Sequence, residues 1–414
     1  MNVMRGSGRG GDDPNRREQV LAFVSDDTSE SIVRAVIAEL MVPFANVQRG
    51  DAMAAGRYLA SHRSPRILIV DLSRSDLPVS TMAGLADVCE PGVAVLAIGD
   101  RNDVGLFRDL IGLGISDYLV KPLSRDLLSR ALGGLLEGRP ETTGTGRGVA
   151  RTGRVVAVVG ARGGVGTTTV AVNLAWSLAE GNARRVALLD LDLHQGSAAL
   201  MLDVKPGPAL REAILNPDRI DAQFIERATA RHGERLFVIA GEEAFDDDIP
   251  LASDGVSRLV GALKSQFHYV VVDMPDVTQS GTQQVLAEAA AVVVVGEPSL
   301  AGARDCTRIT NMIRIQTPRQ RVLVAVNRIG AYRRGELSEA DFEKALGRPV
   351  DVRIAFDPVH ALEDANLGHP AAARSGSLAS GVRRLIDEIG GSPAAGVAQR
   401  GGGWFTRLLP GARA

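Results

Sequence analysis

Residues 154–170 read RVVAVVGARGGVGTTTV, and this stretch decides the fold of the larger part of the chain. An apolar run ends at Gly160, a glycine-rich loop follows, and three threonines then open a helical pattern. Glycines allow backbone N–H groups to close around phosphate oxygens, and the helix that follows adds its positive amino-terminal end. A strand, loop, hydroxyl run and helix in this order predict a phosphate-binding loop at the edge of an α/β sheet.

The loop departs from the usual pattern G-x-x-x-x-G-K-[ST] at two positions. Ala161 stands where the first glycine is expected, and Thr167 stands where the lysine is expected. One positive charge near the β- and γ-phosphates is therefore missing, which predicts a lower nucleotide affinity, weaker transition-state stabilisation, or both. We expect nucleotide to be bound by Arg162, Gly163, Gly164, Val165, Gly166, Thr167, Thr168 and Thr169.

Further polar residues stand where other apolar runs end. Asp190 and Asp192 close the run VALLDLD, and Asp273 closes YVVVDM. Asn327 ends VLVAVN, ahead of Arg328. Open α/β sheets bind ligands outside the carboxyl ends of their strands, so these side chains are expected near the phosphate loop.

The chain as a whole is expected to contain two α/β domains. Apolar runs rich in Val, Ile and Leu alternate with helical patterns over 18–137 and again over 153–390, which favours two doubly wound parallel sheets. Residues 138–152 lack apolar periodicity and read as a linker. Residues 1–17 read as a disordered tail, and 391–414 as a flexible tail with an apolar tip, Trp404–Leu409.

Together these motifs resemble the MinD/ParA family of ATPases, whose phosphate loop reads K-G-G-x-G-K-[ST]. Arg162 takes the place of the early lysine, which in that family reaches the nucleotide of the partner in a dimer. The resemblance implies ATP and Mg²⁺ as cofactors, and a homodimer. It further implies the following roles: Thr168 as a Mg²⁺ ligand, Asp273 holding Mg²⁺ through water, Asp192 orienting the attacking water beside Asp190, Asn327 on adenine, Ala355–Pro358 as the next adenine-side loop, and Thr278–Gln284 as the segment that moves with nucleotide state.

Residues 18–137 resemble a response-regulator receiver domain. Asp71 ends the run RILIVD, at the position of the phosphoacceptor, and Lys121 precedes Pro122 as in that family. Ser25 occupies an expected acidic position, ahead of Asp26 and Asp27, and Gly99 occupies that of the switch hydroxyl. The resemblance to a functional phosphoacceptor site is therefore incomplete, and we expect a docking or oligomerisation module.

A receiver-like domain followed by a MinD/ParA-type ATPase resembles the CpaE/TadZ proteins of the Flp (type IVb, tight-adherence) pilus secretion system. That resemblance implies an ATP-dependent, dimerising localisation and assembly factor with slow hydrolysis, and partners in the pilus machinery at a membrane or pole. Thr167 keeps a second reading open, in which the chain is a scaffold that binds nucleotide without turnover. Two further readings are a DNA- or cargo-positioning ATPase and a phosphorelay regulator.

Composition limits these readings. The 414 residues include 47 Lys and Arg against 49 Asp and Glu, for a formal net charge of −2 and a pI of about 6.3. This balance makes DNA an unexpected partner, with local support only from the basic segment 328–334. The amino-terminal residues lack an apolar signal core, which predicts a cytoplasmic protein. The resemblance implies a place at a cell pole or at the membrane, and the apolar tip has two readings, contact with a membrane or partner, or packing on the body of the protein or disorder. Cys89 and Cys306 are too few for a disulfide framework.

Overall fold

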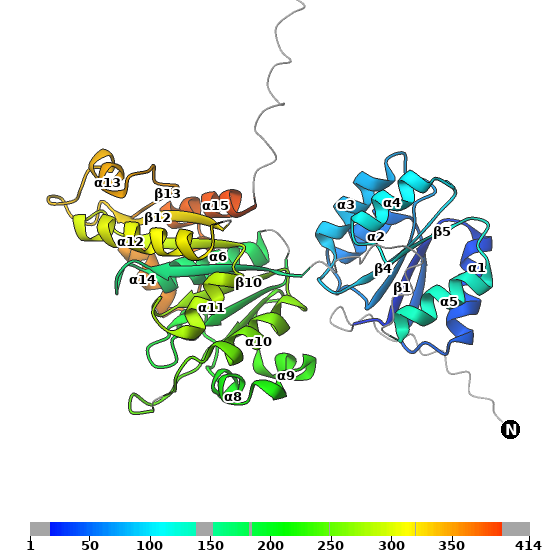
Figure 1. Cartoon of the computed structure of the whole chain (residues 1–414), viewed down its shortest axis with the longest axis horizontal. Coiled ribbons are helices and arrows are strands. Elements are labelled where there is room, and N and C mark those ends of the chain that lie inside the picture. The colour runs from blue at the N-terminus through cyan, green and yellow to red at the C-terminus, as the bar shows by residue number, and fades with distance from the viewer. Residues whose placement is uncertain (1–16, 138–151, 182–183, 248, 319, 391–414) are drawn as a thin grey trace, which may run out of the picture.

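The computed structural model describes residues 17–137, 152–181, 184–247, 249–318 and 320–390. The predicted tails other than Arg17, the linker other than Thr152, and the apolar tip lie outside these residues. The predicted α/β class is confirmed, since two separate sheets are each flanked by helices (Figure 1). We call the parts built on them the N-terminal unit and the C-terminal unit. Among the described residues, no helix is both long and apolar enough to cross a membrane.

The N-terminal unit contains five parallel strands in the order β2-β1-β3-β4-β5. One cluster of apolar side chains packs α2, α3 and α4 on one face, and a second packs α1 and α5 on the other. The strands are β1 (Val20–Val24), β2 (Ala45–Arg49), β3 (Ile67–Asp71), β4 (Ala94–Gly99) and β5 (Asp117–Val120), and the helices are α1 (Asp27–Glu39), α2 (Ala52–Leu59), α3 (Pro78–Val88), α4 (Val104–Gly112) and α5 (Arg125–Leu136).

The C-terminal unit contains eight strands in the order β13-β12-β11-β6-β10-β7-β9-β8. The prediction of a parallel sheet holds for seven of them, but the short edge strand β8 pairs antiparallel with β9. The strands are β6 (Arg154–Gly160), β7 (Val186–Asp190), β8 (Ala230–His232), β9 (Leu236–Ile239), β10 (Tyr269–Met274), β11 (Ala291–Gly296), β12 (Arg321–Ile329) and β13 (Val352–Ala355).

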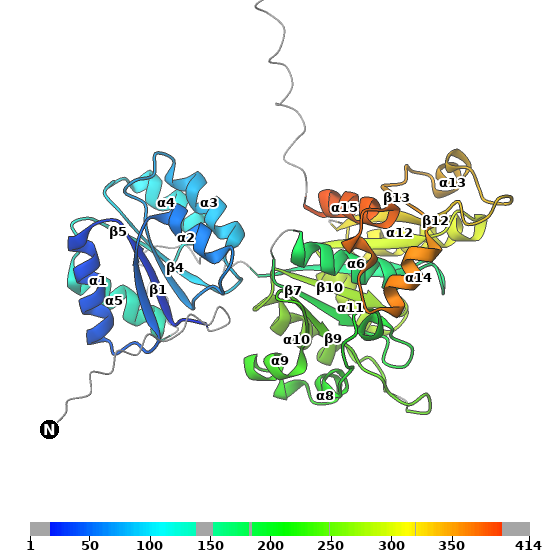
Figure 2. The same ribbon diagram turned by 180° about the vertical axis from the view of Figure 1, so that it is seen from behind.

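Helices cover both faces of this larger sheet. Their bounds are α6 (Thr167–Glu180), α7 (Ala198–Met201), α8 (Ala209–Leu215), α9 (Ala222–Ala228), α10 (Ser253–Lys264), α11 (Ser280–Glu288), α12 (Leu300–Gln316), α13 (Glu339–Leu346), α14 (Pro358–Asn366) and α15 (Ser377–Gly390), with short 3₁₀ turns at Pro217–Arg219 and Ala371–Ala373. Figure 1 looks onto the face covered by α10, α11 and α12, and Figure 2 onto the face covered by α6 and α15. The central strands are therefore buried on both faces, which explains their continuous Val, Ile and Leu runs.

The two units meet at the amino-terminal edges of their sheets. The Arg185 guanidinium, just before β7, donates to Glu90 Oε2 at 2.9 Å, and Glu90 lies in the loop that leads into β4. Gly92 in the same loop has a φ of 77°, and a Cβ there would lie 3.2 Å from the Ser265 carbonyl oxygen. The carboxyl edges of both sheets, where Asp71 and the glycine-rich loop lie, consequently face away from each other.

Candidate functional site

The loop between β6 and α6 lies at the carboxyl edge of the larger sheet. Gly164 and Gly166 have φ angles of 77° and 92°, a left-handed conformation that favours glycine. A Cβ on Gly163 or Gly164 would meet no atom within 4 Å, so the outer side of the loop is open. Gly166 is the N-cap of α6 and supplies no side chain to the first N–H groups of that helix. The loop therefore presents unblocked backbone donors in the arrangement that oxyanions require.

The side chain of Thr167 lies beneath the loop. A Cβ on Gly160 would collide with the Thr167 hydroxyl, which also places that hydroxyl against the base of the loop. Thr167 therefore places a hydroxyl beside Gly160 where the usual pattern has a lysine, and it brings no positive charge. Thr168, the next residue, hydrogen-bonds instead to the carboxylate of Asp273.

Two buried carboxylates lie beside the loop on neighbouring strands. Asp273 of β10 is paired in register with Asp190 of β7, and both are almost fully buried. Burial raises the pKa of Asp190 to about 6, with a smaller contribution from the charge of Asp192. Burial and the charge of Asp190 raise the pKa of Asp273 to about 7, although the Thr168 hydrogen bond opposes this. This like-charged pair favours a nearby cation or a bound proton.

The turn after β7 holds the second carboxylate of the D-x-D pattern. Asp192 Oδ1 accepts hydrogen bonds from the N–H groups of His194 and Gln195, at 3.2 and 2.9 Å. Asp190 accepts from the Asp192 N–H and from the Ala198 N–H, both at 3.1 Å. A Cβ on Gly196 would collide with the Asp192 carbonyl and the Asp190 carboxylate, so only glycine fits there. Asp190 thus supports the turn, while Asp192 is the more exposed of the two.

These oxygens suit Mg²⁺ only in part. Mg²⁺ binds one or two carboxylates together with phosphate oxygens and water, and Asp273 with the Thr168 hydroxyl supplies such a donor set. No group of three or more His, Cys, Asp or Glu side chains among the described residues is arranged to hold a metal alone. The residues present therefore fit a Mg²⁺ ion that arrives with a phosphate ligand.

Asn327 joins the loop to an apolar pocket of about 430 Å³. Its Nδ2 donates to the Val165 carbonyl at 2.9 Å, and a Cβ on Gly166 would collide with that nitrogen. The pocket is lined by Gly166 and Thr169 on the loop side and by Phe356, Pro358 and Leu362 on the other. An apolar space beside a phosphate loop suits a nucleobase. Sequence reasoning pointed to Asn327 and the loop 355–358 but missed Leu362, since nothing in its sequence context marks it.

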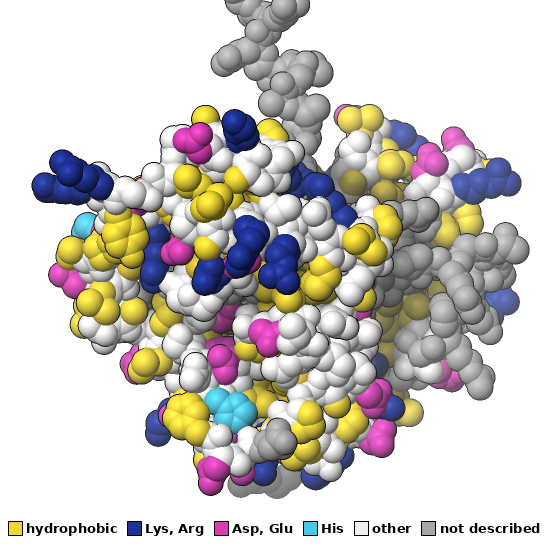
Figure 3. Space-filling view, turned by 60° about the vertical axis from the view of Figure 1, so that its left-hand side comes forward, with side chains coloured by type: hydrophobic (Ala, Val, Ile, Leu, Met, Phe, Trp, Pro, Cys, Tyr) yellow, Lys and Arg dark blue, Asp and Glu magenta, His cyan; other side chains and the backbone are white. Residues whose placement is uncertain are grey.

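Arg162 is the exposed cation of the loop. Its guanidinium Nη1 lies 3.3 Å from Asp305 Oδ2 on α12, and Arg304 and Arg308 also pair with Asp305. Figure 3, which brings the end opposite the N-terminal unit toward the viewer, shows Lys and Arg side chains gathered at the centre of this face. Asp305 was missed by sequence reasoning, because a single acid within a helix carries no signal. Thr278–Gln284 spans the start of α11, and its hydrogen bonds from side chains go to Leu251, Gln279 and Glu288 and not to the phosphate loop.

Asp71 and Lys121 do not belong to this site, because they lie at the far edge of the N-terminal unit. Lys121 Nζ is 2.6 Å from both Asp71 Oδ2 and Asp26 Oδ2, and the Ser25 hydroxyl donates to Asp71 at 2.5 Å. Burial alone would raise the pKa of Asp71, but these bonds hold it below its ordinary value. A Cβ on Gly99 would collide with the Tyr118 hydroxyl, which donates to the Arg101 carbonyl at 3.0 Å.

Comparison with known proteins agrees with this geometry. A ParA family model, described as NUBPL iron-transfer P-loop NTPase, matches residues 151–332. The C-terminal part of the chain is a MinD/ParA-family P-loop NTPase. We call the C-terminal unit the NTPase domain from here on.

Three relatives align with this chain over most of their own length. The septum site-determining protein MinD of Bacillus subtilis is 24% identical over 249 residues, which are 56% of this chain and 87% of MinD. A ParA family ATPase from Chlorobium tepidum shares the fold, at 22% identity and a TM-score of 0.50, over 56% of this chain and 98% of its own. A pilus assembly protein CpaE from Caulobacter crescentus aligns at 28% identity over 28% of this chain and 97% of its own, with a TM-score of only 0.27.

Proposed function

We propose that the NTPase domain binds ATP with Mg²⁺ at the carboxyl edge of its sheet. The observation that carries this proposal is the juxtaposition of open loop amides with a carboxylate and hydroxyl pair, Asp273 and Thr168. The amides of Gly163–Gly166 and the first turn of α6 bind the phosphates, and Asn327 with the apolar pocket binds the base. Mg²⁺ supplies charge neutralisation at the phosphates when bound.

The base preference follows from the hydrogen bonds of Asn327. One of its two amide N–H groups donates to the Val165 carbonyl, so its Oδ1 and its second N–H are the groups available to a base. An acceptor beside a donor matches the amino group and N7 of adenine, whereas guanine presents two acceptors, O6 and N7, on the same edge. Titrating the full chain with ATP and with GTP at millimolar Mg²⁺ in a calorimeter tests both points. Uptake of neither nucleotide would refute the site, and preference for GTP would refute the base assignment.

We propose further that ATP joins two copies of the chain and that Arg162 contacts the phosphates bound by the partner subunit. Two features of Arg162 support this role. Its side chain is exposed on the loop, and its ion pair with Asp305 is partly solvated, so exchanging that pair for a phosphate costs little stability. Light scattering is expected to report a larger dimer fraction with ATP for the natural chain and not for Arg162→Ala. An equal gain in both proteins would exclude Arg162 from the dimer contact.

Hydrolysis is expected to be slow. Thr167 is tucked against Gly160 and supplies no cation, so the transferring phosphate has less charge stabilisation than in a loop with lysine. Asp192, at the rim of the site, is the residue we assign to orienting water. Phosphate release should be low in the natural chain, lower in Asp192→Ala and higher in Thr167→Lys. Equal background rates in the natural chain and Asp192→Ala would favour the second candidate, a nucleotide-binding scaffold without turnover.

The cellular role we propose is localisation and assembly of Flp pilus secretion machinery, with the N-terminal unit as a receiver-like docking module. Support comes from the order of the two units along the chain and from the closed Asp26–Lys121–Asp71 contact, which leaves Asp71 engaged by Lys121 and Ser25. Fluorescent fusions in a host that builds this pilus provide the test. Full pilus assembly without the protein would reject the role, as would assembly supported equally by a chain that lacks residues 18–137.

A further inference from the structure

Two loops at the carboxyl edge of the larger sheet carry opposite charges that the nucleotide site does not use. Residues 242–247 follow β9 and read EEAFDD, and residues 330–336 follow β12 and read GAYRRGE. We call them the acidic loop and the basic loop. Figure 1 shows both at the end of the NTPase domain that lies away from the N-terminal unit, the basic loop beside α13 and the acidic loop beyond α8.

The acidic loop is fixed by one arginine and keeps two carboxylates unpaired. Arg211 pairs with Glu243 and Asp247, at 2.7 and 2.8 Å. Glu242 and Asp246 are exposed, and neither forms an ion pair with any residue that the structure describes. The loop therefore offers two carboxylates to a partner.

The basic loop is built in a matching way. The carboxylate of Glu336 accepts from the N–H groups of Gly330 and Tyr332, at 2.9 and 2.8 Å, and so holds the turn. Arg333 and Arg334 are exposed at its tip, and neither pairs with an acid in the described part of the chain. Two unpaired guanidinium groups on this loop thus match two unpaired carboxylates on the other.

Each loop also carries an exposed aromatic ring beside its unpaired charges. The side chain of Phe245 is 80% exposed, and that of Tyr332 is 68% exposed. Aromatic and arginine side chains are enriched where proteins contact one another. The two loops therefore complement each other in charge, and each adds apolar area to a contact.

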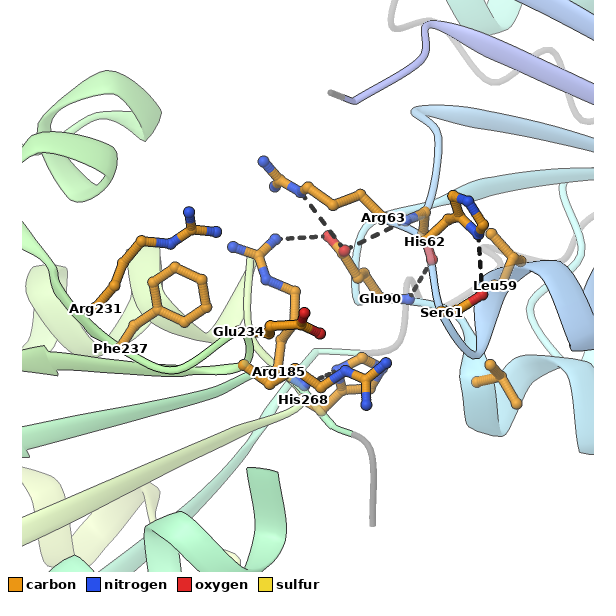
Figure 4. Close-up of a pocket in the computed structure, with 13 residues that line it drawn as sticks. Leu59, Ser61, His62, Arg63, Glu90, Arg185, Arg231, Glu234, Phe237 and His268 are labelled. Carbon is orange, nitrogen blue, oxygen red and sulfur yellow. Dashed lines mark hydrogen bonds and ion pairs between the residues drawn. The ribbon is translucent and has the colours of Figure 1, made fainter. Parts of the chain in front are cut away.

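Charged side chains at the junction of the two units differ, because they contact one another within the chain. Figure 4 shows the Glu90 carboxylate between the side chains of Arg63 and Arg185, and the Arg185 guanidinium lies 2.9 Å from it. The charges of the two loops have no such contacts among the described residues. They are exposed to solvent and available to a partner.

The two loops lie too far apart to bind each other within one chain. Strands β12 and β9 are separated by β11, β6, β10 and β7, and spacings of about 4.8 Å put their ends about 24 Å apart. No hydrogen bond or ion pair joins the loops where the structure describes them. Strands β6 and β10, which carry the phosphate loop and Asp273, are the middle pair between the two loops.

We propose that the acidic loop of one copy of this chain binds the basic loop of a second copy. This inference rests on the ATP-linked dimer proposed above, and it names the surfaces that select the partner. A two-fold axis that crosses the thickness of the sheet between β6 and β10 places each loop opposite its complement, so the contact forms twice. An axis along the sheet edge would place like charges together. Complementary charges of this kind speed association and exclude wrong partners.

Two charge-reversed variants test the contact. Arg333→Glu with Arg334→Glu makes the basic loop acidic, and Glu242→Lys with Asp246→Lys makes the acidic loop basic. Each variant alone meets like charge at both contacts of its dimer. Analytical ultracentrifugation with ATP and Mg²⁺ should show its dimer dissociation constant raised by about tenfold or more, and high salt should reduce this difference.

Mixing the two variants gives the deciding measurement. A dimer of one chain from each variant has opposite charges at both contacts, so the mixture should form dimers nearly as well as the natural chain. Such a rescue requires a contact between chains and folded variants. Absence of rescue, from variants with the circular dichroism spectrum of the natural chain, would overturn the proposal. Where charge reversal unfolds the chain, Arg333→Gln with Arg334→Gln should still raise the dissociation constant, and no change in it would count equally against the contact.

Arg383→Glu with Arg384→Glu is the matched control. These adjacent arginines are exposed on α15, away from the carboxyl edge, and their reversal changes the net charge equally. The control should dimerise as the natural chain does. An ATP-linked dimer that neither loop variant weakens would overturn this inference alone, as would DNA binding as the only property lost in the variant of Arg333 and Arg334. No ATP-linked dimer of the natural chain would overturn it together with the dimer on which it rests.

Discussion

At the residue scale, the two units differ in how their buried carboxylates are compensated. In the NTPase domain Asp190 and Asp273 face each other with only hydrogen bonds to offset burial, and the pKa of each is raised. In the N-terminal unit Asp71 is fully buried but contacts Lys121, and its pKa is lowered. The first arrangement calls for a cation from outside, whereas the second supplies its own.

Removing the Asp273 charge should stabilise the nucleotide-free protein at high pH. The folded pKa of about 7 exceeds the unfolded value of about 3.9, so stability falls as pH rises from about 4 to 7. The Asp273→Asn variant has no ionisable group at this position, so its stability falls much less as the pH rises. One pKa unit corresponds to about 1.4 kcal/mol, and each kcal/mol moves the melting temperature by roughly 2–4 °C. We expect Asp273→Asn to melt several degrees higher than the natural chain at pH 8, and the gap to narrow at pH 5.

Asp276→Asn is the control for that measurement, because Asp276 is exposed and adjacent in sequence. Its melting curve should follow that of the natural chain at every pH. Identical pH dependence in Asp273→Asn and the natural chain would show that folding does not raise the pKa of Asp273.

Removing the Lys121 charge should have the opposite effect. Lys121→Met leaves the fully buried Asp71 without its cation, and breaking a buried pair in this way costs roughly 3–5 kcal/mol. Urea unfolding followed by circular dichroism should report the loss. Lys121→Met combined with Asp71→Asn should recover a large part of it, since the uncompensated charge is then gone. No recovery in the double variant would mean that Lys121 acts through its packing and not through its charge.

At the element scale, the strand ends and the turns after them build the site. Sequence patterns were sufficient for the buried strands β6, β7, β10, β11 and β12, because strands covered on both faces are continuously apolar. The edge strands β2 and β8 were missed, since ANVQR and ARH mix polar with apolar residues and resemble loop sequence. The backbone geometry of the glycine-rich loop could be anticipated from its glycines.

Contacts between distant elements could not be anticipated from sequence. Asp305 binds Arg162 across 143 residues, and Glu90 binds Arg185 across 95. Each involves a charged residue in a region with many other charged residues, so composition gives no reason to select either pair. The predicted set of loop residues and strand-end carboxylates lies together in the structure, but the roles of those residues stay predictions.

The turn between β7 and α7 provides an element-scale prediction. Gly196→Ala places a Cβ against the Asp192 carbonyl and the Asp190 carboxylate, so the turn must shift and both acids move with it. We expect a lower melting temperature and a weaker affinity for a fluorescent ATP analogue. Gly207→Ala is the matched control, because a Cβ there would meet nothing within 4 Å. Equal behaviour of the two variants would mean that the turn tolerates the added atom.

At the scale of the whole molecule, a buried ion pair joins the two units. Among the described charged residues at this junction, Glu90 has a buried carboxylate. It contacts guanidinium groups of both units. Glu226 also faces Arg63, at 3.9 Å, but it is 65% exposed. Buried pairs are disrupted at high cost, whereas exposed pairs contribute little.

Glu90→Gln should therefore loosen the junction while Glu226→Gln should not. Loss of the Glu90 charge leaves the buried Arg185 without this partner and Arg63 with only the exposed Glu226, which favours separation of the units. Small-angle X-ray scattering should report a larger radius of gyration for Glu90→Gln and an unchanged one for Glu226→Gln. An unchanged radius in both would indicate that apolar and backbone contacts alone hold the junction.

The two units meet at the amino-terminal edges of their sheets, and this arrangement determines how a nucleotide-linked pair of chains would be built. If two copies join through their nucleotide edges, their N-terminal units are carried to opposite extremities of the particle. Such a dimer presents two identical N-terminal units. A multivalent partner that binds both units is retained far longer than a partner bound by one unit alone. Loss of nucleotide would leave monomers with one N-terminal unit each. These monomers dissociate readily from the same partner, although the contacts that each unit makes with it are unchanged.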